Sequence, residues 1–190
     1  MILPIRAFGD PVLRKVARNI DQDYPELNTL IQNMYETMED ANGIGLAAPQ
    51  VGLDIRLFCI DVSPLADDED YADIAEELKG FKKVFINAKM LEESGSEWKF
   101  NEGCLSIPDI REDIKRKETI VIEYFDENFV KHTETFSDIR ARVIQHEYDH
   151  IEGILFTDHL SSLKKKLVKG KLSKIMHGDV NVNYKMRFPK

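Results

Sequence analysis

The sequence predicts a single domain that combines helices and strands, an α+β fold. A chain of 190 residues is long enough for one domain with a hydrophobic core, whereas two domains would be crowded. Apolar residues at three- and four-residue spacing predict a helix near residues 25–41. Short runs of branched and aromatic residues predict strands later in the chain. The sequence thus contains both periodic patterns in one domain-sized chain.

The predicted first helix runs from about Pro25 to Ala41, with apolar residues such as Leu27 and Met34 on one face. Pro25 suits a first helical turn, and Gly43 suits the end of the helix. The Gly-rich segment 43–52 follows and has neither helical nor strand period. It lacks the residues of a phosphate-binding loop. We expect a loop or an extended edge to which another group comes close.

The second half of the chain alternates strand and helix patterns. Ser137 is expected to cap a helix that runs to about Glu152 and ends at Gly153. Ser161 is expected to cap a last helix through about Met176. Four strands are expected near 56–62, 83–88, 119–125 and 129–136, of which the last two form a hairpin around residues 126–128.

The net charge of -8 is unevenly distributed. Residues 67–77 form an acidic segment without Lys or Arg, which we interpret as an insertion in a surface loop that can hold a short helix. Residues 163–174 contain six lysines and no acidic residue. This basic segment would suit an anionic partner, although a solvated helix face is the favoured interpretation.

The apolar pattern predicts neither a membrane span nor a signal peptide. No apolar run approaches the roughly 20 residues of a membrane helix. The first residues lack a basic segment followed by an apolar core, so we expect a cytoplasmic protein. The two cysteines, Cys59 and Cys104, do not suggest a secreted disulfide scaffold. Cys59 lies in a predicted strand and is interpreted as a core thiol.

The most informative motif is His146-Glu147-Tyr148-Asp149-His150. On a helix, positions i and i+4 share one face, so His146 and His150 can bind one metal ion. Glu147 lies beside them and can take a proton from metal-bound water. Three fixed residues occur by chance in roughly a few per cent of chains this long. A third ligand is therefore needed.

The downstream sequence offers no good third ligand. Phe156 stands where one class of zinc protease has a third His, and no Glu follows Glu152. Asp158 and Asp179 remain candidates without a supporting pattern. His159 and His177 are out of register and are interpreted as surface or packing residues.

The upstream sequence offers Cys104. It stands between a Gly and a Leu, outside any strand period, and its thiolate would be a strong ligand for a divalent ion. Taken alone, Cys104 could equally be structural. Together with the motif that lacks a downstream partner, it is the favoured third ligand.

Three blocks of this chain resemble the peptide deformylase family: residues 43–50, 102–106 and 146–150. Their order and spacing also fit, and the resemblance extends from about Ile5 to about Leu160. It implies one α+β domain over residues 1–190, with mixed, mainly antiparallel sheets around a central metal-binding helix. Residues 161–190 are expected to form a basic C-terminal helix and tail. Two features depart from the commonest family pattern: the acidic insertion at 67–77, and the tail beyond Lys171, which ends in the non-helical stretch 179–184 and would shorten the basic helix.

The resemblance implies a hydrolase that removes the formyl group from N-formylmethionyl nascent peptides of bacteria and releases formate. It assigns one divalent metal ion to Cys104, His146 and His150. The family usually works with Fe2+, and Zn2+, Ni2+ or Co2+ are substitutes. A Cys/His/His set by itself would suggest zinc.

The same resemblance assigns roles around the metal. Glu147 is the base that takes the water proton and returns it to the leaving amine. The Gln50 side chain and the Leu105 backbone N–H stabilise the oxyanion.

Five further positions are expected to contact substrate. Gly45 and its neighbours would pair with the peptide backbone. Ile44, Val143 and Ile139 would line an apolar pocket for the methionine side chain, although core packing is an equal interpretation for Ile139. Arg111 would meet a substrate carbonyl, and an exposed arginine is its equal alternative.

The expected partners are nascent formylated peptides and, through the basic C-terminal helix of some family members, the ribosome. No membrane and no sequence-specific nucleic acid is expected. The main alternative is an HExxH zinc endopeptidase on the same helix. A metal-binding structural protein is a second alternative, but it does not explain why the Glu147 carboxylate stands beside the metal ligands.

Overall fold

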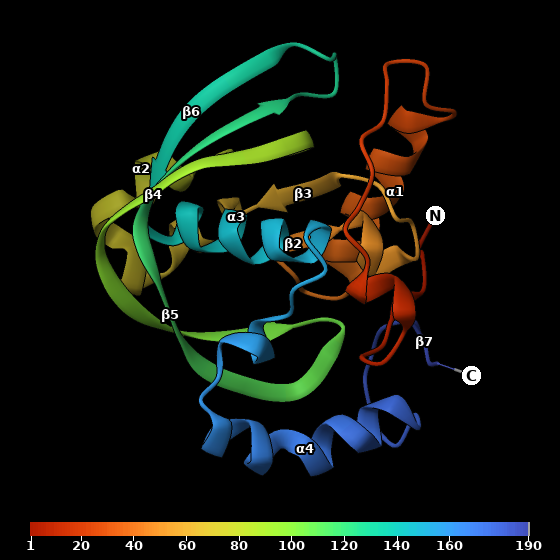
Figure 1. Ribbon diagram of the computed structural model, residues 1–190. Helices are drawn as coiled ribbons and strands as arrows, with labels where there is room; N and C mark the ends of the chain where they lie inside the picture. The colour runs from red at the N-terminus through yellow and green to blue at the C-terminus, as the bar shows by residue number, and fades with distance from the viewer. Residues whose placement is uncertain (190) are drawn as a thin grey trace.

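Helix α3, Asp138–Ile151, lies at the centre of the molecule, and an antiparallel sheet bends around it (Figure 1). The computed structural model describes residues 1–189. The five-stranded sheet has the order β2-β3-β4-β5-β6, and its strands are β2 Gly45–Ala47, β3 Leu57–Asp61, β4 Lys82–Cys104, β5 Ile107–Phe125 and β6 Lys131–Ser137. The other helices are α1 Leu27–Asp40, α2 Ala75–Leu78 and α4 Ser162–Met176. The predicted α+β class and the sheet around the metal-motif helix are confirmed.

Strands β4 and β5 form one long hairpin that curves around α3 and connects the sheet to the metal motif (Figure 1). We expected only the short strands 83–88 and 119–125, and that expectation was wrong for residues 89–104 and 107–118. The register between β4 and β5 shifts at four places, for example between Ile86 and Lys89. Each bulge adds a residue and interrupts the two-residue alternation by which a strand is detected in sequence.

Helix α3 is buried on most of its surface because sheet, loops and the β4–β5 hairpin enclose it. Ile139, Ile144 and Ile151 are each about fully buried. The predicted start of the helix is correct, but its capping is not. Ser137 makes no side-chain cap bond; instead Asp138, at φ 56°, accepts a 2.9 Å hydrogen bond from the Arg140 N–H. An Asp at this position satisfies a free N–H of the first turn as the serine would have done.

The Gly-rich segment after α1 forms the edge strand β2 and a single 3-10 turn, Ala48–Val51. This agrees with the expected extended edge. Helix α1 begins two residues after Pro25, with Glu26 in the left-handed region at φ 54°. The apolar face of α1 packs on β2 and β3 through residues such as Met34 and Leu46.

The acidic segment folds as short 3-10 helices followed by α2, and Tyr71, Ile74 and Leu78 pack against the core cluster that also contains α3 residues. Helix α4 is capped as expected by Ser161, whose side chain accepts a hydrogen bond from Lys164 N. After α4 the chain turns back, and β7, Met186–Arg187, pairs in parallel with β1, Ile5–Arg6. Within residues 1–189, none of the helices has both the length and the apolar character that crossing a membrane requires.

Candidate active site

Three side chains from two elements converge at the turn of the β4–β5 hairpin. Cys104 ends β4, and His146 and His150 project from neighbouring turns of α3. Their ligand atoms, one sulfur and two ring nitrogens, all lie within 4.8 Å of one another. Cys104 Sγ is 3.3 Å from His150 Nε2. The structure therefore brings together the upstream cysteine and the helical histidines.

The residues at this point fit a divalent cation. A thiolate and two imidazoles form the donor set of catalytic zinc-type sites, which keep one further position open. Two buried atoms beside them, Glu147 Oε2 and His150 Nδ1, have no hydrogen-bond partner within the described residues. A buried carboxylate oxygen without a partner is costly unless another group approaches it. A hydrated cation would supply that group to Glu147.

Glu102 orients the histidine that faces Cys104. Its Oε2 accepts a 3.0 Å hydrogen bond from His146 Nδ1, which leaves the other ring nitrogen of His146 to point at the ligand cluster. A carboxylate in this place fixes both the ring orientation and the tautomer. Burial disfavours the charged ring, but hydrogen bonds to Cys104 and Glu102 outweigh it and raise the pKa of His146 well above its ordinary value.

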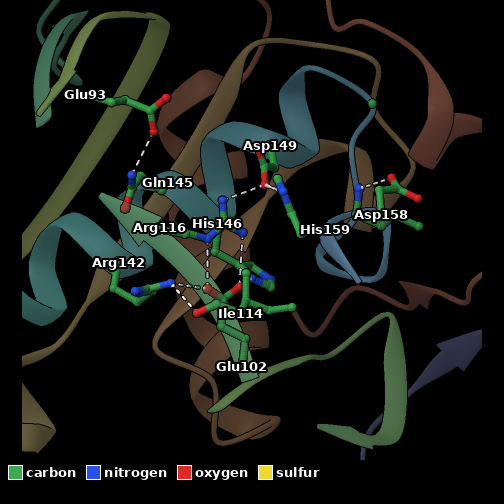
Figure 2. A network of polar contacts seen from close by, with 12 residues as sticks. Glu93, Glu102, Ile114, Arg116, Arg142, Gln145, His146, Asp149, Asp158 and His159 are labelled. Atoms are coloured by element: carbon green, nitrogen blue, oxygen red, sulfur yellow. Dashed lines mark hydrogen bonds and ion pairs between the residues drawn. The ribbon is translucent and has the colours of Figure 1, made fainter. Parts of the chain in front are cut away.

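Two arginines hold Glu102 in turn (Figure 2). Arg116 donates to both carboxylate oxygens, at 2.8 and 3.0 Å, and Arg142 Nη1 donates to Oε1 at 3.0 Å. Arg116 also pairs with Asp149 of the HExxH motif at 2.7 Å. Burial alone would raise the pKa of Glu102, but hydrogen bonds from His146 and Arg116 hold it well below its ordinary range.

Glu147 is buried next to the three ligand residues. Burial raises the pKa of Glu147 from 4.5 to about 7. Strand β2 packs directly on it at Gly45: a Cβ at this position would come within 2.8 Å of the carboxyl carbon. The glycine is needed here because any side chain would displace Glu147.

Gln50 is held beside the thiol by the 3-10 turn after β2. Its Oε1 accepts a 2.8 Å hydrogen bond from Ala47 N, which turns the amide nitrogen toward the site. Nε2 lies 3.5 Å from Cys104 Sγ and 3.4 Å from Ser106 Oγ. The amide group is thus an N–H donor fixed against the ligand cluster before any substrate enters.

A cavity of about 550 Å3 opens over these groups. The expected substrate residues Ile44, Gly45, Val143 and Arg111 line it. Ile139 does not: it lies two helical turns before His146 and packs in the core, as its alternative interpretation had it. Ile139 shares a helix face with His146, but two turns separate the residues by about 11 Å along the axis, so Ile139 does not reach the cavity.

Several residues of the site had no sequence signal. Arg116 and Arg142 come from β5 and α3 and meet only through Glu102. Residues 181–184 of the tail also line the cavity and were not expected there. Glu102 lies in the 102–106 block, and a search for a carboxylate partner of the metal-binding histidines would have found it. Asp149 pairs instead with Arg116 and His159.

Comparison with known proteins agrees with this geometry. Residues 2–166 match the family model described as polypeptide deformylase. The chain belongs to the peptide deformylase family. The match covers most of the chain, so membership does not depend on the HExxH motif alone.

Relatives in this family align over nearly the whole chain. The peptide deformylase of Christiangramia forsetii is 63% identical over 100% of this chain and 97% of its own length. That of Flavobacterium johnsoniae is 62% identical over 99% of this chain and 96% of its own. The crystal structure of a peptide deformylase from Legionella pneumophila superposes with a TM-score of 0.79 at 34% identity, covering 94% of this chain and 98% of that one.

Proposed function

We propose that this chain is a metal-dependent hydrolase that removes the N-terminal formyl group from formylmethionyl nascent peptides and releases formate. Membership of the deformylase family supports this reaction. The observation that carries it is the buried Glu147 carboxylate beside a Cys/His/His cluster, because one of its oxygens has no hydrogen-bond partner among residues 1–189. A purely structural metal site would have no use for that carboxylate.

In the proposed mechanism Cys104, His146 and His150 would hold the cation. When bound there, a divalent cation would supply Lewis acidity toward a water and toward the formyl carbonyl. Glu147 accepts the proton of the attacking water and delivers it to the leaving amine. Because it is buried against Gly45 and α3, Glu147 holds the transferred proton away from bulk solvent.

Two donors are proposed to stabilise the oxyanion. The Gln50 amide is fixed by Ala47 N, and the Leu105 N–H belongs to the two-residue turn between β4 and β5. Donors that are in place before charge develops lower the barrier without reorganisation. Ile44 and Val143 line the cavity with apolar surface that suits a methionine side chain. Arg111 is exposed at its rim, where Asn101 holds its guanidinium at 2.9 Å.

We propose Fe2+ as the ion used in the cell, with Zn2+, Ni2+ or Co2+ as substitutes, and a cytoplasmic place of action where nascent chains emerge. The donor set fits each of these borderline ions.

The zinc endopeptidase alternative is not supported, because the family match and the relatives all point to deformylases.

Formate release tests the function directly. Protein loaded with Fe2+ without oxygen should release formate from formyl-Met-Ala-Ser and leave unformylated Met-Ala-Ser and internal peptide bonds intact. Coupled detection of formate and mass spectrometry of the peptide measure both. Cys104→Ser should lower bound metal and activity together, because an alcohol is a poor ligand at neutral pH. Cleavage of internal bonds without formate would refute the proposal.

We further propose that α4 contacts the ribosome. Its lysines are largely exposed, and Leu163 and Leu167 are exposed on the same helix. A basic surface binds polyanions such as RNA in a salt-dependent way. The triple change of Lys164, Lys165 and Lys166 to Glu should abolish co-sedimentation with ribosomes at low salt and leave peptide deformylation unchanged. Equal co-sedimentation of variant and wild type would reject the contact.

A further inference from the structure

The C-terminal tail reaches the active site from outside the region that the family model matches. The match ends at residue 166, whereas Asn181, Val182, Asn183 and Tyr184 line the cavity above the ligand cluster. Relatives such as the Christiangramia forsetii protein align over 100% of this chain, so they include the tail. A wall of the cavity is therefore built from a segment beyond the residues that the family model matches.

The tail is fastened by the short parallel pair of β1 and β7. Ile5 N donates a 2.8 Å hydrogen bond to Lys185 O, and Ala7 N donates a 3.0 Å bond to Arg187 O. Phe188 packs into the cluster that also holds α4. The segment just before β7 is thus held in place at the mouth of the cavity.

Tyr184 is the tail residue that contacts the catalytic turn. Its hydroxyl donates a 2.8 Å hydrogen bond to the carbonyl oxygen of Leu105. A phenol is protonated at neutral pH, because its ordinary pKa is about 10, so it acts as the donor. The ring is half-buried and, like Leu105, packs against the core cluster formed around α1 and β3.

The turn that Tyr184 holds carries three parts of the site. Cys104 supplies the thiol, Leu105 the N–H, and Ser106 a hydroxyl 3.4 Å from the Gln50 amide. A second clamp comes from the N-terminal segment, where Phe8 N donates a 2.8 Å hydrogen bond to Ser106 O. Both ends of the chain therefore hydrogen-bond to this turn, the N-terminal segment through the Phe8 backbone N–H and the tail through the Tyr184 side chain.

We propose that Tyr184 is a positioning residue: by holding the Leu105 carbonyl it sets the direction in which the Leu105 N–H meets the developing oxyanion. The two planar peptide groups beside the Leu105 Cα are joined through only two rotatable bonds, so restraining one restricts the other. A small misplacement of such a donor weakens transition-state stabilisation. This inference rests on the proposed deformylase function and adds to it a residue beyond the family-model match.

The test compares full-length, metal-loaded wild type with Tyr184→Phe, which keeps the ring and removes only the hydroxyl. We expect kcat for formyl-Met-Ala-Ser to fall about three- to tenfold, as loss of one hydrogen bond implies. KM and bound metal should stay unchanged, since the lost interaction acts on the transition state. The control is Tyr71→Phe, a tyrosine of the acidic segment that does not line the cavity.

Each result has one meaning. If wild type releases no formate, the proposed function fails and this inference with it. If wild type is active but Tyr184→Phe equals it in kcat, the inference alone fails. A rise in KM at constant kcat, or a loss of metal, would assign Tyr184 to binding or to the ligand cluster and would overturn positioning. An equal loss of kcat in Tyr71→Phe would also overturn positioning, because it would indicate a general packing effect. A lower melting temperature of Tyr184→Phe that accounts for the lost activity would do the same.

Discussion

Replacing Glu147 with glutamine should lower kcat for formate release by about 100- to 10,000-fold, the usual contribution of a positioned acid–base group. Glutamine has nearly the same shape but cannot take the proton of water or return one to the amine. The ligands Cys104, His146 and His150 are untouched, so bound metal should remain at wild-type level. Steady-state kinetics and metal analysis on the same preparation measure both quantities.

Glu152→Gln is the matched control for this change. Glu152 lies just beyond the same helix and forms an ion pair with Arg56 at 2.7 Å, away from the cavity. Its variant should keep a kcat close to wild type. Wild-type turnover in Glu147→Gln would show that the proton is carried by another group.

The pH dependence of kcat/KM should follow the same carboxylate. Burial raises the pKa of Glu147 to about 7, and the base works only when deprotonated. Activity should therefore rise with pH and level off once the carboxylate is ionised. A bound cation favours the ionised form, which places the acid limb at about pH 7 or below. The acid limb of the pH profile should be absent from the residual activity of Glu147→Gln. If it persists there, the titrating group is another residue.

Replacing Glu102 with glutamine should destabilise the fold by about 3–5 kcal/mol, because it removes the anion from a buried charge cluster. Arg142 is 1% exposed and Arg116 6%, so their charges would stay in the interior with less compensation. A neutral amide also turns an N–H2 group toward donors that need an acceptor. Chemical denaturation of the metal-free protein measures the change without interference from metal binding.

Glu112→Gln serves as the control for Glu102. It lies on β5 and pairs with Lys164 at 2.6 Å; the Lys164 side chain is 41% exposed and that of Glu112 24%. Ion pairs that solvent reaches contribute about 0–1 kcal/mol, so this variant should lose much less stability than Glu102→Gln. Similar losses in both variants would contradict the special role of the buried cluster.

The sign of the pH effect on stability follows from Glu102. Its pKa in the folded protein lies well below the ordinary 4.5, so the stability it contributes is fully present above that value. It is lost as pH falls below about 4.5, where the unfolded chain takes up the proton first. The difference in unfolding free energy between wild type and Glu102→Gln should therefore narrow in acid.

The parts of the site that lie close together in sequence could be predicted well. His146, Glu147 and His150 share one helical face by spacing alone, and the structure places the two histidine ligand atoms within 4.8 Å of each other. Cys104 was favoured because no downstream ligand fitted, and it lies where that reasoning required. Val143, one turn before His146, lines the cavity as expected. Ile139 does not, because helical spacing predicts a face and says nothing of how far a cavity extends along it.

The long hairpin escaped prediction for a physical reason. Its exposed stretches carry many charges, for example Glu92, Glu93 and Lys99, and bulges break the alternation that marks a strand. Yet the bend of that hairpin brings Cys104 and Glu102 to α3, as Figure 2 shows for Glu102. The feature that assembles the site was thus the one with the weakest local pattern.

The amino-acid sequence by itself determined the helix that carries two ligands and the base, since helical spacing is a local property of the chain. Tertiary structure alone decided the rest. The Glu102 cluster joins residues up to 44 positions apart, and the Tyr184 contact with Leu105 joins residues 79 apart. Such contacts depend on how β4 and β5 curve and on where the tail pairs with β1. Neither can be predicted from the spacing of apolar residues along the chain.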